Sequence, residues 1–467
     1  MGSTMSPNNN NIDYGLKLNS RGVSTLTTGV RPFFTKSLRS TLIFLLWSLF
    51  LLAFSVPLGA QVQGGLPADL QSFIAEALQA NPDIKQMADM AAATRETIRS
   101  SKALDDPDFQ FTMKDIPTNT WSLNQDDMTQ KMFMLSQKFP FPGKRQVRSE
   151  VAASQAQTDS YITQDKANEV RAKVIQAYWM RSMARGSFDI TAKSKELWEQ
   201  VVKVTETRYA TGQGMQADVL QAQVELGNYL DRQFQWQQKQ ESAQADLNAL
   251  RSKPPQTPLS TPAPLKSRPF NLKLEELLGS AKDNPKLLAL QAAIEKQGKS
   301  VTLAKKEYFP DFTFQTAYGL RENKGDLKRS DMFTGAVMVN LPIWHAGKIK
   351  PRIREEEAKE NAAKGGYQGA FNQLQAAMKD KFAKLLSLSQ QATLYGRGII
   401  PQARQAADAS LAAYQTGTLD FARLTQNFIA LYNAELQLQE YLKDFEDNWA
   451  ELEWLVGQEL PRQGAVK

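Results

Sequence analysis

The sequence predicts a mainly α-helical protein with a small β part, arranged as two similar halves. First, Lys144–Thr211 contains no proline and a single glycine, Gly186, so we expect one helix about 100 Å long. Second, residues 68–111 match residues 271–314 at a constant offset of 203. Third, aromatic residues alternate with a period of two in short segments of both halves, which is typical of strands.

The long helix has a narrow apolar stripe. Apolar residues recur at steps of three and four at Val170, Val174 and Ala177, with Gln, Lys, Arg and Asp between such positions. This pattern indicates coiled-coil-like packing against other helices rather than burial in a thick core.

The first 60 residues have the parts of a secretory signal. Five basic residues and one acid precede an apolar run at 41–56, and the small residues Gly59 and Ala60 follow it. We therefore expect a signal peptide over 1–60 with cleavage near Ala60. The alternative is an uncut signal anchor, because a run of about 16 residues is near the lower limit for a spanning helix.

Charge and cysteine content exclude several classes of protein. The formal charge is +7, of which the leader supplies +4, so the rest of the chain carries about +3. A basic protein that binds nucleic acid is therefore not indicated. Because the chain has no cysteine, it has no disulfide, no thiolate metal site and no lipid-bearing cysteine after the signal. No apolar run of 18 residues follows the leader.

The repeat divides the chain. We expect a first repeat over 61–251, a second over 271–460 and a tail over 461–467, joined by a connector at 252–270 whose prolines keep it extended. The constant offset brings together Pro82 with Pro285, Pro107 with Pro310, and Asp108 with Asp311. Downstream, the run FPFPGK (139–144) corresponds to LPIWHAGK (341–348).

Each half is expected to contain a short helix of about 22 residues that starts at its proline, a β-hairpin, a long helix and a returning helix. Because Gly365, Gly366, Gly396 and Gly398 interrupt the second long helix, we expect a bend near Pro401. The hairpins are predicted at 108–140 and 311–342, the long helices at 144–211 and 348–416, and the returning helices at 217–250 and 421–454.

The predicted strands are the length that crosses a bilayer when tilted. The return strands, Lys131–Phe139 and Met332–Leu341, have about nine to eleven residues. Open sheet edges cannot lie in lipid, so four such strands must close a barrel with copies of themselves. The alternative is a pair of soluble hairpins that pack on helices.

The chain resembles the TolC family of outer-membrane efflux ducts over residues 66–460. The similarity lies in the duplicated plan, in QKFPFPGK at 137–144, and in the two Y-x-T-G turns at 209–212 and 414–417, followed by ADVL and ARLT. The FPFPGK run is most similar to the branch represented by CusC and CzcC, which serves heavy-metal pumps of the RND class.

The resemblance implies a homotrimer in the outer membrane of a Gram-negative bacterium. Twelve strands form one barrel among the membrane lipids, and the helices continue it as a tube through the periplasm. The implied function is a passive exit duct, not an enzyme and without a cofactor, that receives substrate from an inner-membrane RND pump through a periplasmic adaptor (membrane fusion protein). Heavy-metal cations are the expected cargo. Drug efflux and type I protein secretion remain alternatives, as does a membrane-anchored periplasmic coiled-coil adaptor; no nucleic acid is expected.

The same resemblance assigns two regions. The turns form the periplasmic tip, and Tyr414 matches the tyrosine that closes it, although Leu419 stands where TolC has an arginine. The tip candidates are Tyr209, Gly212, Asp218, Tyr414, Gly417, Asp420 and Arg423. The barrel-to-helix junction contains Phe139, Pro140, Phe141, Pro142, Gly143, Lys144, Pro342, Gly347 and Lys348.

The acids near the turns have two interpretations. Three copies of Asp420 facing a trimer axis would attract cations, as charged rings do in channels. Alternatively, Asp218 and Asp420 stabilise the N-termini of the returning helices. We expect both glycines, Gly212 and Gly417, to end the long helices in a left-handed conformation.

No catalytic, cofactor or metal site is predicted. His345 is the only histidine and offers no ligand cluster, so we expect it near the barrel rim. Met113, Met128, Met132 and Met134 carry thioethers that suit Cu(I), but Met132 and Met134 share a strand face and are expected to fill the barrel wall.

Overall fold

The structure, a computed structural model, describes residues 65–462. The expected signal peptide over 1–60, its cleavage near Ala60 and residues 463–467 of the tail lie outside the described residues. Among the described helices, none has the length and apolar character needed to cross a membrane.

The first half contains four helices and two strands among its described residues. Asn81 begins the second helix, because its side chain accepts a hydrogen bond from the Asp83 backbone N–H and Pro82 suits the first helical position. The elements are α2 (Ala68–Ala80), α3 (Pro82–Lys102), β1 (Asp108–Lys114), β2 (Gln130–Phe139), α4 (Lys144–Ala210) and α5 (Gln216–Leu250).

The second half follows the same order. Asn284 caps α7 as Asn81 caps α3, and each asparagine also donates to the end of a returning helix, at Leu455 O (2.8 Å) and Leu250 O (3.0 Å). The elements are α6 (Leu274–Ser280), η1 (Ala281–Asp283), α7 (Pro285–Lys306), β3 (Phe312–Leu320), β4 (Met332–Val339), η2 (His345–Ile349), α8 (Lys350–Leu394), η3 (Tyr395–Ile399), α9 (Ile400–Gln415) and α10 (Phe421–Val456).

The second long helix is interrupted at one of the two predicted places. It continues through Gly365 and Gly366, and it is divided at η3, a π-helical turn just before Pro401. Proline has no N–H and its ring crowds the carbonyl four residues earlier, so a wider turn accommodates it. A second π-helical turn, η2, replaces the predicted start of this helix at Lys348.

Other boundaries also differ. Of the two return strands, β2 has ten residues, as predicted, and β4 has eight, fewer than predicted; β1 has seven. Helices α2 and α6 precede the predicted short helices and were not predicted. Helix α4 ends at Ala210, with Thr211 as its C-cap.

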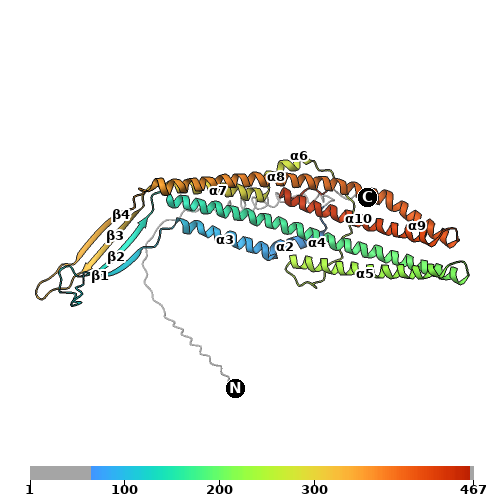
Figure 1. The fold of residues 1–467 in the computed structure, drawn as a ribbon, viewed down its shortest axis with the longest axis horizontal. Helices are drawn as coiled ribbons and strands as arrows, with labels where there is room; N and C mark the ends of the chain where they lie inside the picture. The colour runs from blue at the N-terminus through green and yellow to red at the C-terminus, as the bar shows by residue number, and fades with distance from the viewer. Residues whose placement is uncertain (1–64, 463–467) are drawn as a thin grey trace, which may run out of the picture. The chain divides into compact units, whose positions relative to one another are not determined.

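The four strands form one antiparallel sheet in the order β1-β2-β3-β4 (Figure 1). Strands β2 and β3 come from different halves, and Phe139 pairs with Phe312. One face carries Phe109, Phe111, Phe133, Leu135, Phe314, Tyr318, Phe333 and Val337, all exposed. The other face carries Gln110, Thr112, Met132, Met134, Gln315 and Thr334. The sheet therefore has one aromatic face and one mixed polar face, with unpaired edges at β1 and β4.

Helix α4 organises the helical part, because α3, α5, α7 and α10 all pack against it. The strands lie beyond its first residue, and the two chain reversals lie together at its other end (Figure 1). A buried cluster near those reversals packs Trp198 of α4 and Tyr229 of α5 against Phe421, Phe428 and Tyr432 of α10. This cluster holds the two helical hairpins side by side.

Candidate functional site: the helical turns and the strand-to-helix junction

The two helical turns have the same backbone geometry. Gly212 has a φ of 73° and Gly417 a φ of 79°, the left-handed conformation expected for both. Gly212 N–H donates to Tyr209 O (3.0 Å), and Gly417 N–H donates to Tyr414 O (3.1 Å). These bonds satisfy carbonyls at the ends of α4 and α9 and reverse the chain into α5 and α10.

Tyr414 links the two turns. Its hydroxyl donates to Asp218 Oδ2 (3.1 Å), which lies in the first turn of α5. The ring is 2% exposed, and burial together with the neighbouring carboxylate raises the pKa of Tyr414 to about 12. The phenol is therefore a stable hydrogen-bond donor at neutral pH and joins the second half to the first.

Arg208 completes this link and was missed in the sequence. Its guanidinium lies over the Tyr414 ring, 4.7 Å from the centroid, and Nη1 donates to Tyr414 O. Nη2 donates to Gln213 O (2.9 Å) in the first turn. A basic residue in the last turn of α4 was the available signal, since cations favour helix C-termini.

The other residues predicted at the tip make local contacts or are exposed within one chain. Asp420 caps α10, because its Oδ1 accepts from the Arg423 backbone N–H (2.7 Å). Asp218 also lies in a first turn but bonds Tyr414 instead of capping its own helix. Tyr209 is exposed. The charged-ring interpretation of Asp420 stays a prediction.

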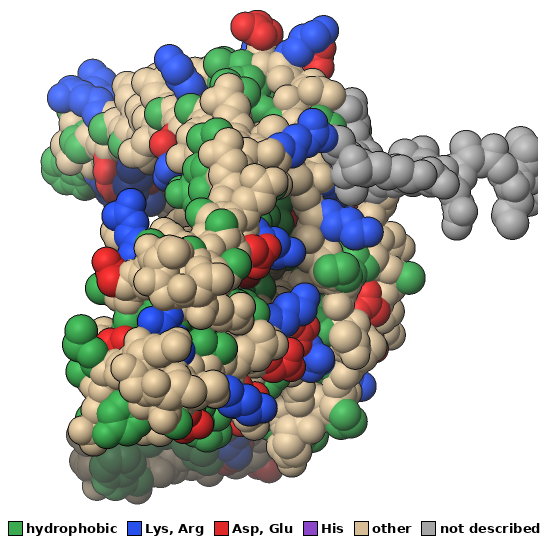
Figure 2. Space-filling model, turned by 90° about the vertical axis from the view of Figure 1, so that its right-hand side faces the viewer, with side chains coloured by type: hydrophobic (Ala, Val, Ile, Leu, Met, Phe, Trp, Pro, Cys, Tyr) green, Lys and Arg blue, Asp and Glu red, His purple; other side chains and the backbone are tan. Residues whose placement is uncertain are grey.

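A cavity of about 500 Å³ lies between the turns and is lined by Gly212, Asp218, Tyr414, Leu419 and Phe421, among others. Figure 2 shows the face at this end of the helices, where basic and acidic side chains are interspersed rather than gathered by sign. The turns therefore enclose space beside the Tyr414–Asp218 bond.

The strand-to-helix junction is built around Lys144. Gly143 precedes it with a φ of 85°, and Lys144 Nζ then lies 2.7 Å from Asp311 Oδ1 and 2.7 Å from Phe309 O. Asp311 Oδ1 also accepts from Phe141 N–H (2.9 Å), and the Phe141 ring stacks on Phe309 at 4.5 Å. The junction of the first half is therefore bonded directly to the start of β3 in the second.

The corresponding junction of the second half is different. Pro342 leads into η2, where Gly347 and Lys348 are exposed, and Lys348 forms no ion pair with any residue in 65–462. His345 lies near Tyr308, with ring centroids 6.3 Å apart. Asp311, like Arg208, was not among the predicted site residues, although its repeat match with Asp108 marked the position.

The family model described as Outer membrane efflux protein matches residues 73–251 and 279–458, which together make up most of the chain. This chain belongs to the outer membrane efflux protein family. It is accordingly a channel-family protein and not an enzyme. No curated protein matches the sequence.

Solved structures share the fold of this efflux protein. VceC from Vibrio cholerae is 18% identical, with a TM-score of 0.70, and the match covers 84% of this chain and 97% of that one. CusC is 16% identical, with a TM-score of 0.70 and coverage of 87% and 96%. The MtrE channel from Neisseria gonorrhoeae is 16% identical, with a TM-score of 0.69 and the same coverage. At these identities the matches show the fold alone.

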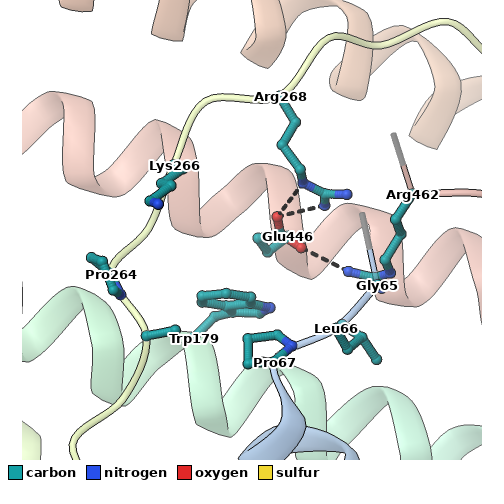
Figure 3. Close-up of a pocket in the computed structure, with 10 residues that line it drawn as sticks. Gly65, Leu66, Pro67, Trp179, Pro264, Lys266, Arg268, Glu446 and Arg462 are labelled. Carbon is teal, nitrogen blue, oxygen red and sulfur yellow. Dashed lines mark hydrogen bonds and ion pairs between the residues drawn. The ribbon is translucent and has the colours of Figure 1, made fainter. Parts of the chain in front are cut away.

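In this efflux protein the connector and the C-terminal segment are held by buried ion pairs. Glu446 of α10 lies between Arg268 of the connector, at 2.5 Å, and Arg462, at 2.9 Å (Figure 3). Arg462 and Arg171 of α4 both bond Glu453, at 2.9 and 3.1 Å. The network therefore ties three separate segments to the middle of the helical part.

A cavity of about 370 Å³ lies beside this network. Figure 3 shows Trp179, Pro67 and Pro264 around it, with Arg268 and Glu446 on another side. The connector also bonds α4 directly, because Ser182 Oγ donates to Ala263 O (2.6 Å). The connector is thus an extended segment that runs across the helices, as its proline content predicts.

Proposed function

We propose that this outer membrane efflux protein is the passive exit duct of a tripartite efflux system. A homotrimer closes its strands into one twelve-stranded barrel in the outer membrane, and the helices form a tube through the periplasm. A periplasmic adaptor and an inner-membrane RND pump deliver the substrate and the energy. The family assignment supports the efflux role.

The observation that carries the proposal is the sheet. Its aromatic face is exposed, with Phe109 68% and Phe333 74% accessible, and both edge strands are unpaired in one chain. Lipid would cover the aromatic face, and copies of the same sheet would pair the edges. Four strands are too few to close alone, so membrane insertion requires an oligomer.

The two turns supply the gate of the proposed duct. Tyr414, Asp218 and Arg208 join the helical hairpins of one chain, so separating these hairpins breaks the Tyr414–Asp218 bond and the Arg208 contacts. We propose that this separation opens the periplasmic end of the tube when the adaptor binds. Two tandem efflux repeats, 61–251 and 271–460, then contribute one hairpin each to the tip.

Heavy-metal cations are the proposed cargo. The run at 137–144 and its similarity to the CusC and CzcC branch support this assignment, and Asp218 and Asp420 place carboxylates near the turns. A duct for drugs or for type I protein secretion is the second candidate. VceC and MtrE match this chain as well as CusC does, so the fold does not single out the heavy-metal branch.

One experiment tests the duct. The full chain is expressed in a Gram-negative host, the two membranes are separated, and the outer fraction is run on a gel unheated and heated. The duct requires a band in the outer membrane that migrates as a trimer until heated. An uncut monomer in the inner membrane would refute the duct and favour the membrane-anchored adaptor.

The gate is tested on the same purified protein. Tyr414→Phe keeps the ring under Arg208 but removes the donor to Asp218, so conductance in planar bilayers should increase. Cargo is tested separately, by measuring tolerance to metal salts, drugs and secreted protein yield in a host that lacks its own ducts.

A further inference from the structure

The internal repeat predicts a second ion pair equivalent to Lys144–Asp311. In the repeat, Asp311 corresponds to Asp108, and Lys144 corresponds to Lys348. Both counterparts are exposed, and neither side chain forms an ion pair or hydrogen bond with another residue in the described range 65–462. The second Lys–Asp pair that the repeat predicts is therefore not formed within the described part of one chain.

The positions of these two residues explain why one chain cannot join them. Lys144 follows β2 and Asp311 precedes β3, and these two strands are neighbours in the sheet. Lys348 follows β4 and Asp108 begins β1, and these strands are the opposite edges of the sheet. A bond between them requires the β4 edge to meet the β1 edge of another copy.

We propose that Lys348 binds Asp108 of a neighbouring copy, and that this ion pair sets the strand register between subunits. The inference rests on the proposed oligomeric duct and names the residues that join its subunits. The neighbouring copy completes a site that one chain contains only in halves, with a lysine on one edge and a carboxylate on the other.

The repeat also predicts the register. The pair Gln137–Phe314 between β2 and β3 translates, through the offsets of the two halves, into Val339 of one copy opposite Phe111 of the next. In the chain, Val339 and Phe111 both lie on the aromatic face of the sheet. The translated register therefore keeps this face continuous across the subunit boundary, which a shift by one residue would not do.

The helices also have an exposed surface that a neighbouring copy can contact. Helix α4 packs on α7 through Lys296 Nζ to Gln155 Oε1 (3.0 Å) and Lys299 Nζ to Ser154 Oγ (2.9 Å). The counterpart of this contact joins α8 to α3 of a second copy. Helix α3 buries only Ala91 within its own chain, so its outer surface is available.

The second half carries two additional residues, His345 and Ala346, between the strand and its lysine. They form part of η2 and move Lys348 away from the position that Lys144 takes after Gly143. The flexible lysine side chain spans this difference. Because η2 is exposed, we expect the intersubunit pair to be more accessible to solvent than Lys144–Asp311.

Charge exchange tests the pair. The full chain is isolated from outer membranes, and the temperature at which the oligomer band dissociates is measured on gels. Asp108→Lys and Lys348→Asp should each lower that temperature by several degrees, and the double variant should restore it. The matched controls, Asp105→Lys and Lys350→Asp, alter exposed charges beside the pair. They should leave the dissociation temperature unchanged. Failure of the double variant to recover, or equal effects in the controls, overturns the pairing.

Cysteine cross-linking tests the register without altering either charge. The chain has no cysteine, so Phe111→Cys and Val339→Cys can be expressed on separate copies in the same cells. Mild oxidation should give a covalent dimer, because directly opposed residues place their Cβ atoms within about 5.5 Å. Thr112→Cys with Val339→Cys is the control, since Thr112 lies on the other face.

The outcomes separate this inference from the proposed function. A wild-type oligomer that shows neither charge rescue nor the Phe111–Val339 cross-link contradicts the pairing and leaves the duct intact. A wild-type protein that is monomeric contradicts both.

Discussion

Lys144 Nζ lies 2.7 Å from Asp311 Oδ1, and the side chains of both residues are largely buried, at 7% and 13% exposed. The bond joins the first residue of α4 to the residue before β3, so it fixes where the helices end and the sheet begins. The carboxylate accepts from Phe141 N–H as well, which satisfies the same oxygen twice. This contact is the main polar link between the two halves at the junction.

Lys144→Met is expected to destabilise the fold by about 3 kcal/mol, because it removes the closest cation from a largely buried carboxylate and leaves it only the Phe141 N–H bond and the more distant Lys138. Thermal unfolding of the purified protein measures the effect. Lys138→Met is the control, since Lys138 Nζ lies 4.0 Å from Asp311 and is half exposed; its effect should stay within about 1 kcal/mol. Equal effects would mean that the Lys144 bond contributes little.

Gly417→Val is expected to damage the tip. A β-branched residue resists the φ of 79°, and a Cβ at this position lies 3.3 Å from Arg208 Nη2. Efflux in a complemented host should fall sharply while the protein still reaches the membrane. Gly366→Ala is the matched control, because this helical glycine has open space around it and should gain up to about 1 kcal/mol of stability. Normal efflux in Gly417→Val would contradict the assignment of the turn.

Two variants distinguish the capping role of Asp420 from a role of its negative charge in the pore. Asp420→Ala removes the acceptor of the Arg423 N–H bond and should weaken the first turn of α10 by about 1 kcal/mol, which amide hydrogen exchange detects. Asp420→Asn retains a capping oxygen but removes the charge. If the residue acts only as a cap, the asparagine variant has wild-type cation selectivity in planar bilayers; a changed selectivity would show that the carboxylate faces the pore.

The raised pKa of Asp447 predicts that the stability of the fold depends on pH. Burial raises the pKa of this carboxyl from 3.8 to about 6, although Lys443 Nζ lies 2.8 Å from Oδ2 and lowers it in part. The folded state holds the proton more tightly than the unfolded state. This contribution to stability is therefore complete below about pH 4 and is lost as the pH rises through about 6.

Asp447→Asn should raise the unfolding temperature at pH 7 and have little effect at pH 4, with a difference in stability of at most about 3 kcal/mol. Thermal melts at the two pH values measure this difference. Asp444→Asn is the control, because Asp444 is half exposed and its loss should have a small effect at both pH values. An Asp447→Asn effect that is equal at pH 4 and pH 7 would exclude titration of Asp447 as the cause.

The prediction succeeded where a local signal was present and failed where it was absent. Gly212 and Gly417 each follow the last residues of a predicted long helix, and both adopt the predicted left-handed conformation. Helices α2 and α6 were missed because they are short segments ahead of the prolines that mark the following helices. Arg208 was missed because its partner, Tyr414, is 206 residues away in the chain.

The sequence by itself determined the order of short helix, β-hairpin, long helix and returning helix in each half, the extent of α4, the extended connector and the positions of the turns. These follow from proline and glycine placement and from residue periodicity, which act over a few residues. The tertiary structure decided the strand order, the register of β2 against β3 and the bonds Lys144–Asp311 and Tyr414–Asp218. The residues of each bond are more than 160 positions apart, so packing of the two halves against each other selects the partners.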